Sequence, residues 1–345
     1  MPEETDRAQT EERRRPPTIR DVAERAGVSK SLVSLVLRSS PKVSDTSRVA
    51  VEEAIEELGY RPSRMARSLV NRRSGLMGIV TSNTRDLFYA EVVQGLSEYV
   101  NESERGLIPL ILHGNHIDEE EQLATRRFLE LRAEALVLMG SALSDADVDR
   151  LGTEIPTAIV GRWLESGAVD VIVNDDRAGG AMATRHLLDL GHRRIAHITG
   201  GNGNGARARE TSYRRMMEEA GCEPVVVEGD YLQSGGARGA HRILDGAGDM
   251  PTGIFAANDL AAIGAMDVLR RAGRRIPDDM SIIGYDDISW AAMAPIDLTT
   301  INQPARQMGQ TAARLLCERI TTGSFEGQTV VLEPTLVVRS TTGPV

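Results

Sequence analysis

The sequence has few cysteines, few aromatic residues and no long hydrophobic run. Its 345 residues include only two cysteines, Cys222 and Cys317, which lie far apart and in no metal-binding spacing. A disulfide framework is therefore excluded, and two buried, reduced thiols are expected. No stretch approaches the ~18 uninterrupted apolar residues of a membrane-spanning helix. The first residues lack the apolar core of a signal peptide, so we expect a cytoplasmic protein with no membrane partner.

Motifs of catalysis and cofactor binding are also missing. The chain contains no G-x-S-x-G motif, no Cys–His pair at an evident site and no paired catalytic carboxylates. His113 and His116 have no further ligands nearby, so no metal site is expected. The glycine run from Thr199 to Gly205 has the spacing G-x-G-x-G and lacks the acidic partner of a dinucleotide loop. We therefore expect no cofactor and no enzyme, with a dinucleotide enzyme kept as one alternative.

The formal net charge of −10 hides an uneven distribution of charge along the chain. Residues 13–75 contain 14 Lys and Arg against 7 Asp and Glu, a net charge of +7. Residues 1–12 carry −4, which leaves −13 on residues 76–345. A small basic region in front of an acidic body is typical of a domain that binds a polyanion such as DNA.

The basic region begins with a pattern of two short helices joined by a tight turn. Thr18 and Asp21 have the spacing of a capping box at the first helix. Gly27 suits the turn, and Ser29 can cap the second helix. Apolar residues recur three and four apart along that helix and are expected to face inward: Leu32, Val33, Val36 and Leu37. The outward-facing residues are then Lys30, Ser31, Ser34, Leu35 and Arg38. This is the geometry of a helix-turn-helix, whose second helix enters the major groove of DNA.

Two further helices are predicted after this motif. One spans residues 45–58, begins at the cap Ser44 and ends at Gly59. The other follows Pro62 and is shorter than the ~12 residues that an isolated helix needs to persist in water, so it requires a partner to stay formed. Residues 1–17 show no apolar period and predict a disordered tail.

Beyond residue 75 the pattern changes to alternating strands and helices. Apolar strands are predicted at 76–81, 107–112, 135–139, 169–173, 194–199, 225–227, 253–257 and 281–285. Helices are predicted at 88–101, 118–131, 178–190, 206–220, 236–244 and 260–272. Such alternation indicates parallel sheets covered on both faces. Because the rhythm restarts near residue 169, we expect two lobes with a ligand between them, at the carboxyl ends of the strands.

The chain resembles the lactose-repressor (LacI/GalR) family of bacterial transcription regulators. The matching runs in the basic region are T-I-R-D-V-A-E-R-A-G-V-S, V-S-L-V-L and L-G-Y-R-P-S-R-M-A-R-S-L, in the family's order and spacing. In the body, the matching stretches are 88–95, 191–195, 256–259, 281–287 and 298–304. The resemblance implies an all-α helix-turn-helix headpiece and an α/β type I periplasmic-binding-protein-like body of two lobes.

The resemblance also implies domain boundaries. The disordered tail (1–17) is followed by the DNA-binding domain (18–62), the hinge helix and linker (63–74) and the effector-binding and dimerisation domain (75–340). The N-lobe combines 75–173 with 303–333, and the C-lobe combines 174–302 with 334–340. The three crossings between lobes are expected near 173–175, 302–304 and 333–335.

Family positions that contact DNA can be carried over residue by residue. Lys30, Ser31 and Leu35 occupy positions that read base edges in relatives. Leu35 departs from the polar or basic residue of many relatives; it either touches a thymine methyl group or reads nothing. Leu69 matches the hinge leucine that relatives wedge into the minor groove, with packing on its dimer mate as the compatible alternative. The remaining expected DNA contacts, mostly to phosphate, are Thr18, Ser29, Ser34, Arg38, Ser44, Ser47 and Arg64.

Effector contacts can be carried over in the same way. Arg209 matches an effector-binding arginine, Asp286 matches the aspartate that pairs with sugar or ribose hydroxyls, and Asn258 matches another cleft contact. Asp259 is expected to cap the helix that follows it. Aromatic or strand-end positions complete the expected site: Phe88, Tyr89, Tyr231, Arg162 and Trp163. Core packing remains an alternative for each aromatic residue. Gly161 stands where many relatives have an aspartate, so one polar contact is expected to be absent.

These features predict a repressor that binds a palindromic double-stranded operator as a homodimer and responds to a small-molecule effector, most simply a carbohydrate. The effector would move the lobes and so decide whether the two hinge helices fold in the minor groove. Besides the dinucleotide enzyme, two alternatives remain: control by a phosphoprotein partner, and a small-molecule binding protein without working DNA readout. The sequence does not distinguish inducer from corepressor. Because no zipper-like segment follows Val338, a dimer is favoured over a tetramer.

Overall fold

The structure is a computed structural model that describes residues 17–37, 40–61, 74–83, 86–103, 105–114, 117–246 and 248–345. It divides into two compact units, Met1–Ser74 and Gly75–Val345. Three expected DNA contacts, Arg38, Arg64 and Leu69, lie outside the described residues. The expected hinge helix lies outside them as well, as does the expected tail apart from Pro17.

The described part of the first unit is a three-helix headpiece, formed by α1 (Ile19–Arg25), α2 (Lys30–Val36) and α3 (Asp45–Leu58). The predicted caps are present: the Thr18 N–H donates to the Asp21 carboxylate at 2.6 Å, and Ser29 Oγ accepts from the Leu32 N–H at 3.2 Å. Ser44 caps α3, and Gly59 ends it with a φ of 60°. The three helices bury Val22, Val33 and Val51 completely, which gives the headpiece a small core.

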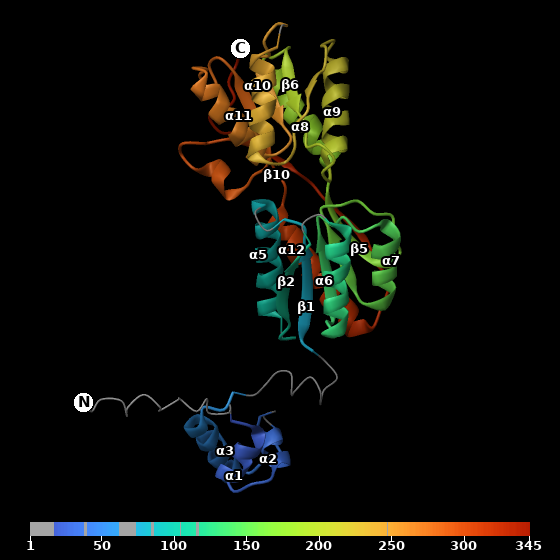
Figure 1. Ribbon diagram of the computed structural model, residues 1–345, viewed down its shortest axis with the longest axis vertical. Coiled ribbons are helices and arrows are strands. Elements are labelled where there is room, and N and C mark those ends of the chain that lie inside the picture. The colour runs from blue at the N-terminus through green and yellow to red at the C-terminus, as the bar shows by residue number, and fades with distance from the viewer. Residues whose placement is uncertain are drawn as a thin grey trace, which may run out of the picture. The chain divides into compact units, whose positions relative to one another are not determined.

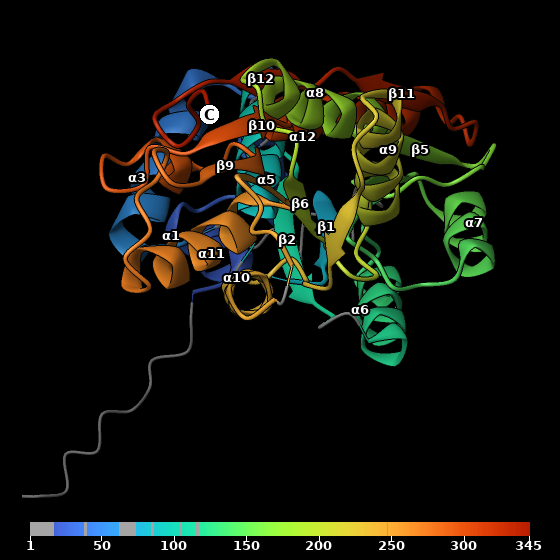
Figure 2. The ribbon, with the colours of Figure 1, turned by 90° about the horizontal axis from the view of Figure 1, so that it is seen from above.

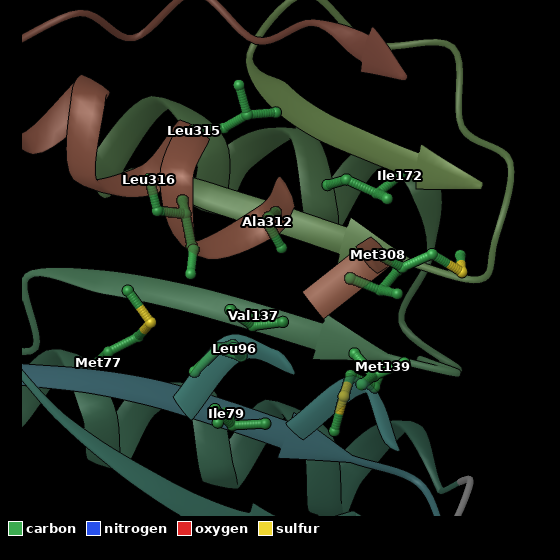
Figure 3. Packing of buried hydrophobic residues seen from close by; sticks show 14 of the residues in the cluster. Met77, Ile79, Leu96, Val137, Met139, Ile172, Met308, Ala312, Leu315 and Leu316 are labelled. Atoms are coloured by element: carbon green, nitrogen blue, oxygen red, sulfur yellow. The ribbon is translucent and has the colours of Figure 1, made fainter. Parts of the chain in front are cut away.

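The first lobe of the second unit contains a six-stranded parallel sheet in the order β11-β5-β4-β3-β1-β2. Its strands are β1 (Leu76–Thr81), β2 (Ile108–His113), β3 (Ala135–Met139), β4 (Thr157–Val160), β5 (Val169–Asn174) and β11 (Thr329–Leu332). Helices α5 (Leu87–Glu102) and α12 (Ala305–Thr322) cover one face, while α6 (Asp118–Glu130) and α7 (Asp145–Glu154) cover the other. Figure 3 shows side chains of α12, including Met308, Ala312 and Leu316, above Val137 of the sheet.

The second lobe has a six-stranded sheet in the order β12-β10-β9-β8-β6-β7, parallel except where β12 pairs with β10. Its strands are β6 (Ile195–Ile198), β7 (Val225–Val227), β8 (Gly253–Ala256), β9 (Ser281–Asp286), β10 (Thr299–Asn302) and β12 (Thr335–Val337). Helices α8 (Asp176–Asp189) and α9 (Ala206–Glu219) pack on one face, and α10 (Gln233–Leu244) and α11 (Asp259–Arg271) on the other. In Figure 2, β6 and β9 lie between these two helix pairs. A short 3-10 helix, η1 (Ser289–Ala292), follows β9.

The two lobes are connected by three crossings of the chain. The chain leaves the first sheet after β5, returns between β10 and α12, and leaves again between β11 and β12. Figure 1 shows these segments passing between the two lobes of the second unit. The first lobe therefore contains residues from both before and after the second lobe in sequence. No described helix has the length and apolarity to cross a membrane.

Candidate functional site

The expected DNA-reading surface of the headpiece centres on the first turn of α2. Lys30 and Ser31 are exposed there, directly after the Ser29 cap. Ser34 is half-buried, one turn further along the helix. Leu35 differs from the sequence expectation of an outward-facing residue, because it is half-buried and packs against the headpiece core.

Two of the expected phosphate contacts lie together at the start of α3. Ser44 Oγ accepts from the Ser47 N–H at 3.3 Å and donates to Ser47 Oγ at 3.0 Å. Thr18 is half-buried, and its hydroxyl donates to the Asp21 carboxylate at 2.7 Å at the start of α1. All these hydroxyls therefore lie at helix N-termini, where backbone N–H groups and the helix dipole favour an anion such as phosphate.

The second unit contains a cavity of about 450 Å³ between its lobes. Six of the eight expected effector residues line it: Phe88, Tyr89, Arg209, Tyr231, Asn258 and Asp286. They come from α5 on the first lobe and from α9, β9 and the segments before α10 and α11 on the second. Residues separated by up to two hundred positions in sequence thus converge on one volume, at the carboxyl ends of the strands, as expected for this topology.

Arg209 is the buried cation of this cavity. Its Nε donates to Asp176 Oδ1 at 2.9 Å, its Nη1 donates to the Ala257 carbonyl at 2.6 Å, and Nη1 lies 3.9 Å from Asp286 Oδ1. The guanidinium also stacks 3.6 Å from the centroid of the Tyr285 ring. These contacts fix the plane of the guanidinium, so its remaining donors have a defined direction.

Asp286 is the acidic counterpart of Arg209. Gln303 Nε2 donates to its Oδ1 at 2.6 Å. Burial raises the pKa of the Asp286 carboxyl well above its usual range, against the opposing effect of Arg209. Asp286 and Asp287 have φ angles of 116° and 58°, which residues other than glycine rarely adopt. Such backbone strain is found preferentially at functional sites.

Tyrosine side chains provide neutral polar groups beside this pair. Burial raises the pKa of both Tyr89 and Tyr231 above the usual phenol value, so both hydroxyls stay protonated. The Tyr231 hydroxyl donates to the Asn204 carbonyl at 2.6 Å. A Cβ at Gly200 or Gly203 would lie 2.5 Å or 2.2 Å from the Tyr231 ring. The glycine-rich run therefore makes room for this ring, which explains its composition without a bound nucleotide.

Asn258 takes the capping role that was expected of Asp259. The expectation that Asp259 caps α11 is wrong: Asn258 Oδ1 accepts from the Ala261 N–H at 2.9 Å and is the cap. The Asn258 amide donates to the Tyr231 carbonyl at 3.1 Å, which leaves this side chain on the cavity wall but engaged. Asp259 is completely buried and accepts from the Thr300 hydroxyl and the Ile288 N–H.

The other two expected effector residues, Arg162 and Trp163, line a second cavity of about 1020 Å³. Arg162 donates to the Ser141 and Leu143 carbonyls at 3.0 Å and 2.6 Å and forms an ion pair with Asp145. Its guanidinium therefore anchors a loop. Trp163 is 65% exposed.

Sequence reasoning missed several polar residues of the first cavity, among them Asn174 and Gln303. Asn174 Nδ2 donates to the Tyr285 hydroxyl at 2.7 Å. Both lie in segments where the resemblance placed a crossing between lobes, and that position was the available signal for a cleft contact. Among the residues that the structure describes, no three His, Cys, Asp or Glu side chains gather as metal ligands would.

Comparison with known proteins matches both units of the chain. Residues 18–63 match the bacterial regulatory proteins of the lacI family, and residues 184–342 match a periplasmic binding protein-like domain. The HTH-type transcriptional regulator CelR of Thermobifida fusca is 39% identical over 341 residues, covering 95% of this chain and 99% of that protein.

Two solved structures extend the likeness to the fold. A CelR–cellobiose complex is 33% identical, with a TM-score of 0.70 and coverage of 94% of this chain and 99% of that one. A lac repressor dimer, bound to operator and the anti-inducer ONPF, is 28% identical with a TM-score of 0.83. That match covers 95% of this chain and all of the repressor chain.

Proposed function

Because this chain belongs to the lacI family of bacterial regulatory proteins, we propose that it is a homodimeric repressor switched by a sugar bound between its lobes. Its DNA target is a palindromic operator, and the sugar changes the affinity for that operator. As a regulator it acts in the cytoplasm, where the DNA is, and performs no catalysis. The headpiece with its exposed Lys30 and Ser31 supports the DNA-binding part of this proposal.

A single observation carries the assignment of the ligand site. The buried Arg209–Asp286 pair lies on the wall of a cavity that Phe88, Tyr89 and Tyr231 also line. Charged donors and acceptors fix the hydroxyl groups of a sugar, and aromatic rings pack against its C–H faces. The CelR–cellobiose complex shows that a related chain holds a sugar. The same cavity in this chain is therefore the proposed effector site.

The experiment measures operator binding and sugar binding in one protein. Palindromic DNA selected from a random library by the full chain serves as operator, and a panel of mono- and oligosaccharides is screened by thermal shift. A sugar that raises the melting temperature should also change the operator Kd by about 5–150-fold, the usual range of coupling between two sites. A regulator that binds DNA but responds to no sugar would favour control by a phosphoprotein. Failure to select any DNA would favour a binding protein without DNA readout.

Two matched variants locate the sugar. Asp286→Asn removes the carboxylate from the cavity while keeping its shape, and should weaken sugar binding by about 10–100-fold in calorimetry. Asp297→Asn is the control, because Asp297 also has a positive φ (43°) but lines neither inter-lobe cavity. Equal effects of the two substitutions would contradict the assigned site.

A further inference from the structure

The effector cavity continues into the second, larger cavity. Five residues line both volumes: Gly161, Asn174, Asp176, Gly203 and Asn204. The two cavities, of about 450 Å³ and 1020 Å³, therefore share a boundary and are called here the inner and outer chambers. The outer chamber lies between the segment after β4 and β11 on the first lobe and the N-terminal turns of α8 and α9 on the second.

The boundary between the chambers is formed in part by residues without side chains. A Cβ at Gly161 would be 3.7 Å from the Phe88 ring and from the Tyr89 hydroxyl, so a side chain at this position would project into the shared boundary. Gly161 has a φ of 79°, which favours glycine. Gly161 thus lines both chambers without adding a side chain to the boundary between them.

A buried polar side chain also lies at this boundary, because Asn174 lines both cavities. Asn174 is 6% exposed, and its Nδ2 donates a hydrogen bond to the Tyr285 hydroxyl. Within the described part of the chain its Oδ1 has no hydrogen-bond partner. Buried polar groups are nearly always paired, so this acceptor calls for a donor at the junction. A hydroxyl group of a ligand that spans the junction supplies one.

The outer chamber is lined by side chains of the kinds that bind sugars. Trp163 contributes an indole ring that is 65% exposed. Across the chamber lie Arg177 of α8 and Arg207 of α9, both exposed, and neither guanidinium bonds another described residue. An indole ring packs well against the C–H face of a pyranose, and guanidinium groups donate to its hydroxyls.

We propose that the effector is an oligosaccharide of at least two units. One unit lies in the inner chamber beside Arg209 and Asp286, and the next lies over Trp163 in the outer chamber, with a hydroxyl at the junction donating to Asn174. The proposal rests on the proposed function, because it assumes that the effector is a sugar. In this proposal, Trp163 is the residue that makes the protein select an oligosaccharide over a single sugar.

Matched pairs of sugars provide the test. Glucose, galactose, mannose and xylose are each compared with their β1,4- and α-linked disaccharides and with the corresponding trisaccharides, by calorimetry on the full chain. We expect at least one disaccharide to bind about tenfold or more tightly than its monosaccharide. Trp163→Ala should lower the affinity for that disaccharide by about tenfold, the size of one aromatic contact, and change the affinity for the monosaccharide by less than about twofold.

The second tryptophan gives the control and a second readout. Trp290 lies on η1, is 45% exposed and lines neither chamber, so Trp290→Ala should leave the affinity for both sugars unchanged. In Trp290→Phe, Trp163 is the sole tryptophan, and the disaccharide but not the monosaccharide should shift its fluorescence. This readout does not depend on whether Trp163→Ala folds.

The outcomes separate the two proposals. If a monosaccharide binds as tightly as its oligosaccharides, and neither alters the fluorescence of Trp163, the outer chamber is no subsite while the sugar-switched repressor stands. If no sugar of any length binds, the proposed function fails and this inference fails with it.

Discussion

We propose that Lys30 is the residue on which sequence-specific reading by the headpiece depends most directly. It is exposed on the first turn of α2, and the N-terminal residues of a recognition helix contact base edges. Lys30→Ala should weaken binding to the selected operator by about 5–150-fold, the effect of one base contact, and relax the preference at one base pair of each half-site. Competition binding to operator variants measures both effects.

The control for that prediction is the only other lysine of the chain, Lys42. It is exposed in the segment between α2 and α3 and not on α2 itself. Lys42→Ala removes the same charge, so it should weaken binding to all sequences about equally. A Lys30→Ala variant that behaved like Lys42→Ala would make Lys30 a phosphate contact.

We expect Asp259 to make the stability of the second lobe depend on pH. Burial raises the pKa of its carboxyl to about 7, although hydrogen bonds from Thr300 and the Ile288 N–H favour the ionised form. In the unfolded chain the pKa is about 4. The stability that the native protonated carboxyl contributes is therefore complete below about pH 4 and is lost as the pH rises through about 7.

Asp259→Asn should remove this dependence. An amide resembles the protonated carboxyl, and the Thr300 hydroxyl can rotate to accept from it. The free energy of unfolding of the variant, minus that of the wild type, should increase as the pH rises from about 4 to about 7 and then level off. Urea unfolding at several pH values measures it. A difference that stayed constant with pH would mean that Asp259 does not titrate in this range.

At the residue scale, the sequence predicts chemistry better than it predicts contacts. The resemblance correctly predicted that Arg209 and Asp286 line one cavity, because the fold determines which strand ends converge. The resemblance did not show which of Asn258 and Asp259 caps α11, since either side chain can cap a helix. In the structure Asn258 accepts from the Ala261 N–H, while Asp259 is buried and accepts from the Thr300 hydroxyl. Leu35 was expected to face outward, but its side chain is half-buried against the headpiece core, a contact that the spacing of apolar residues in one helix does not reveal.

Among the elements, helix pairs in each lobe pack with their backbones in contact. A Cβ at Gly95 of α5 would lie 1.9 Å from the Arg306 carbonyl oxygen of α12, and one at Gly309 would lie 1.9 Å from the Val92 carbonyl oxygen. The second lobe repeats the arrangement between α10 and α11, where Gly236 and Gly264 have the same role. Each glycine thus permits an approach that any side chain would prevent.

Gly95→Ala should therefore destabilise the protein by about 1–3 kcal/mol, the range of overpacked sites, even though alanine has the higher helix propensity. Gly167→Ala is the control, because a Cβ there meets nothing within 4 Å, and the change should stay within about 0.5 kcal/mol. Urea unfolding of the three proteins measures the difference. A stabilised Gly95→Ala variant would show that α5 and α12 can separate freely.

The bounds of some elements follow from the sequence alone. Strands β1 and β3 are apolar apart from Thr81, and both were predicted with the bounds that the structure shows. No helix was predicted at α12, although its buried residues, among them Met308, Ala312 and Leu316, recur three or four positions apart as in other amphipathic helices. What the sequence does not reveal is the partner of that face, since the small residues Gly309 and Ala313 and the ion-paired Arg319 are buried only because other elements pack against them. The short α7 and β4 are also not predicted, since ten- and four-residue elements carry little periodic signal.

For the whole molecule, the uneven distribution of charge predicts that operator binding and sugar binding respond differently to salt. The basic region carries +7 and residues 76–345 carry −13. Operator binding releases counterions, so its affinity should fall at least about 100-fold between 50 mM and 200 mM salt. Binding of a neutral sugar should change less than about twofold over that range. Fluorescence anisotropy and calorimetry of one preparation compare the two, and a flat operator response would contradict DNA binding through phosphate contacts.

The alternation of strands and helices predicted two lobes with parallel sheets, and the structure confirms that architecture. The proposed folding of the hinge helix on DNA stays a prediction, since residues 63–70 lie outside the described residues. No periodic pattern within one chain reports on a helix whose formation depends on a second chain and on DNA.

The three crossings also determine the order in which a ribosome can complete this protein. The first lobe lacks α12 and β11 until residue 332 has been synthesised, and the second lacks β12 until residue 337. A stop codon after residue 304 would therefore leave both lobes unfinished, because the first would lack α12 and β11 and the second would lack β12. Such a truncated protein would contain no complete lobe that could bind the sugar alone.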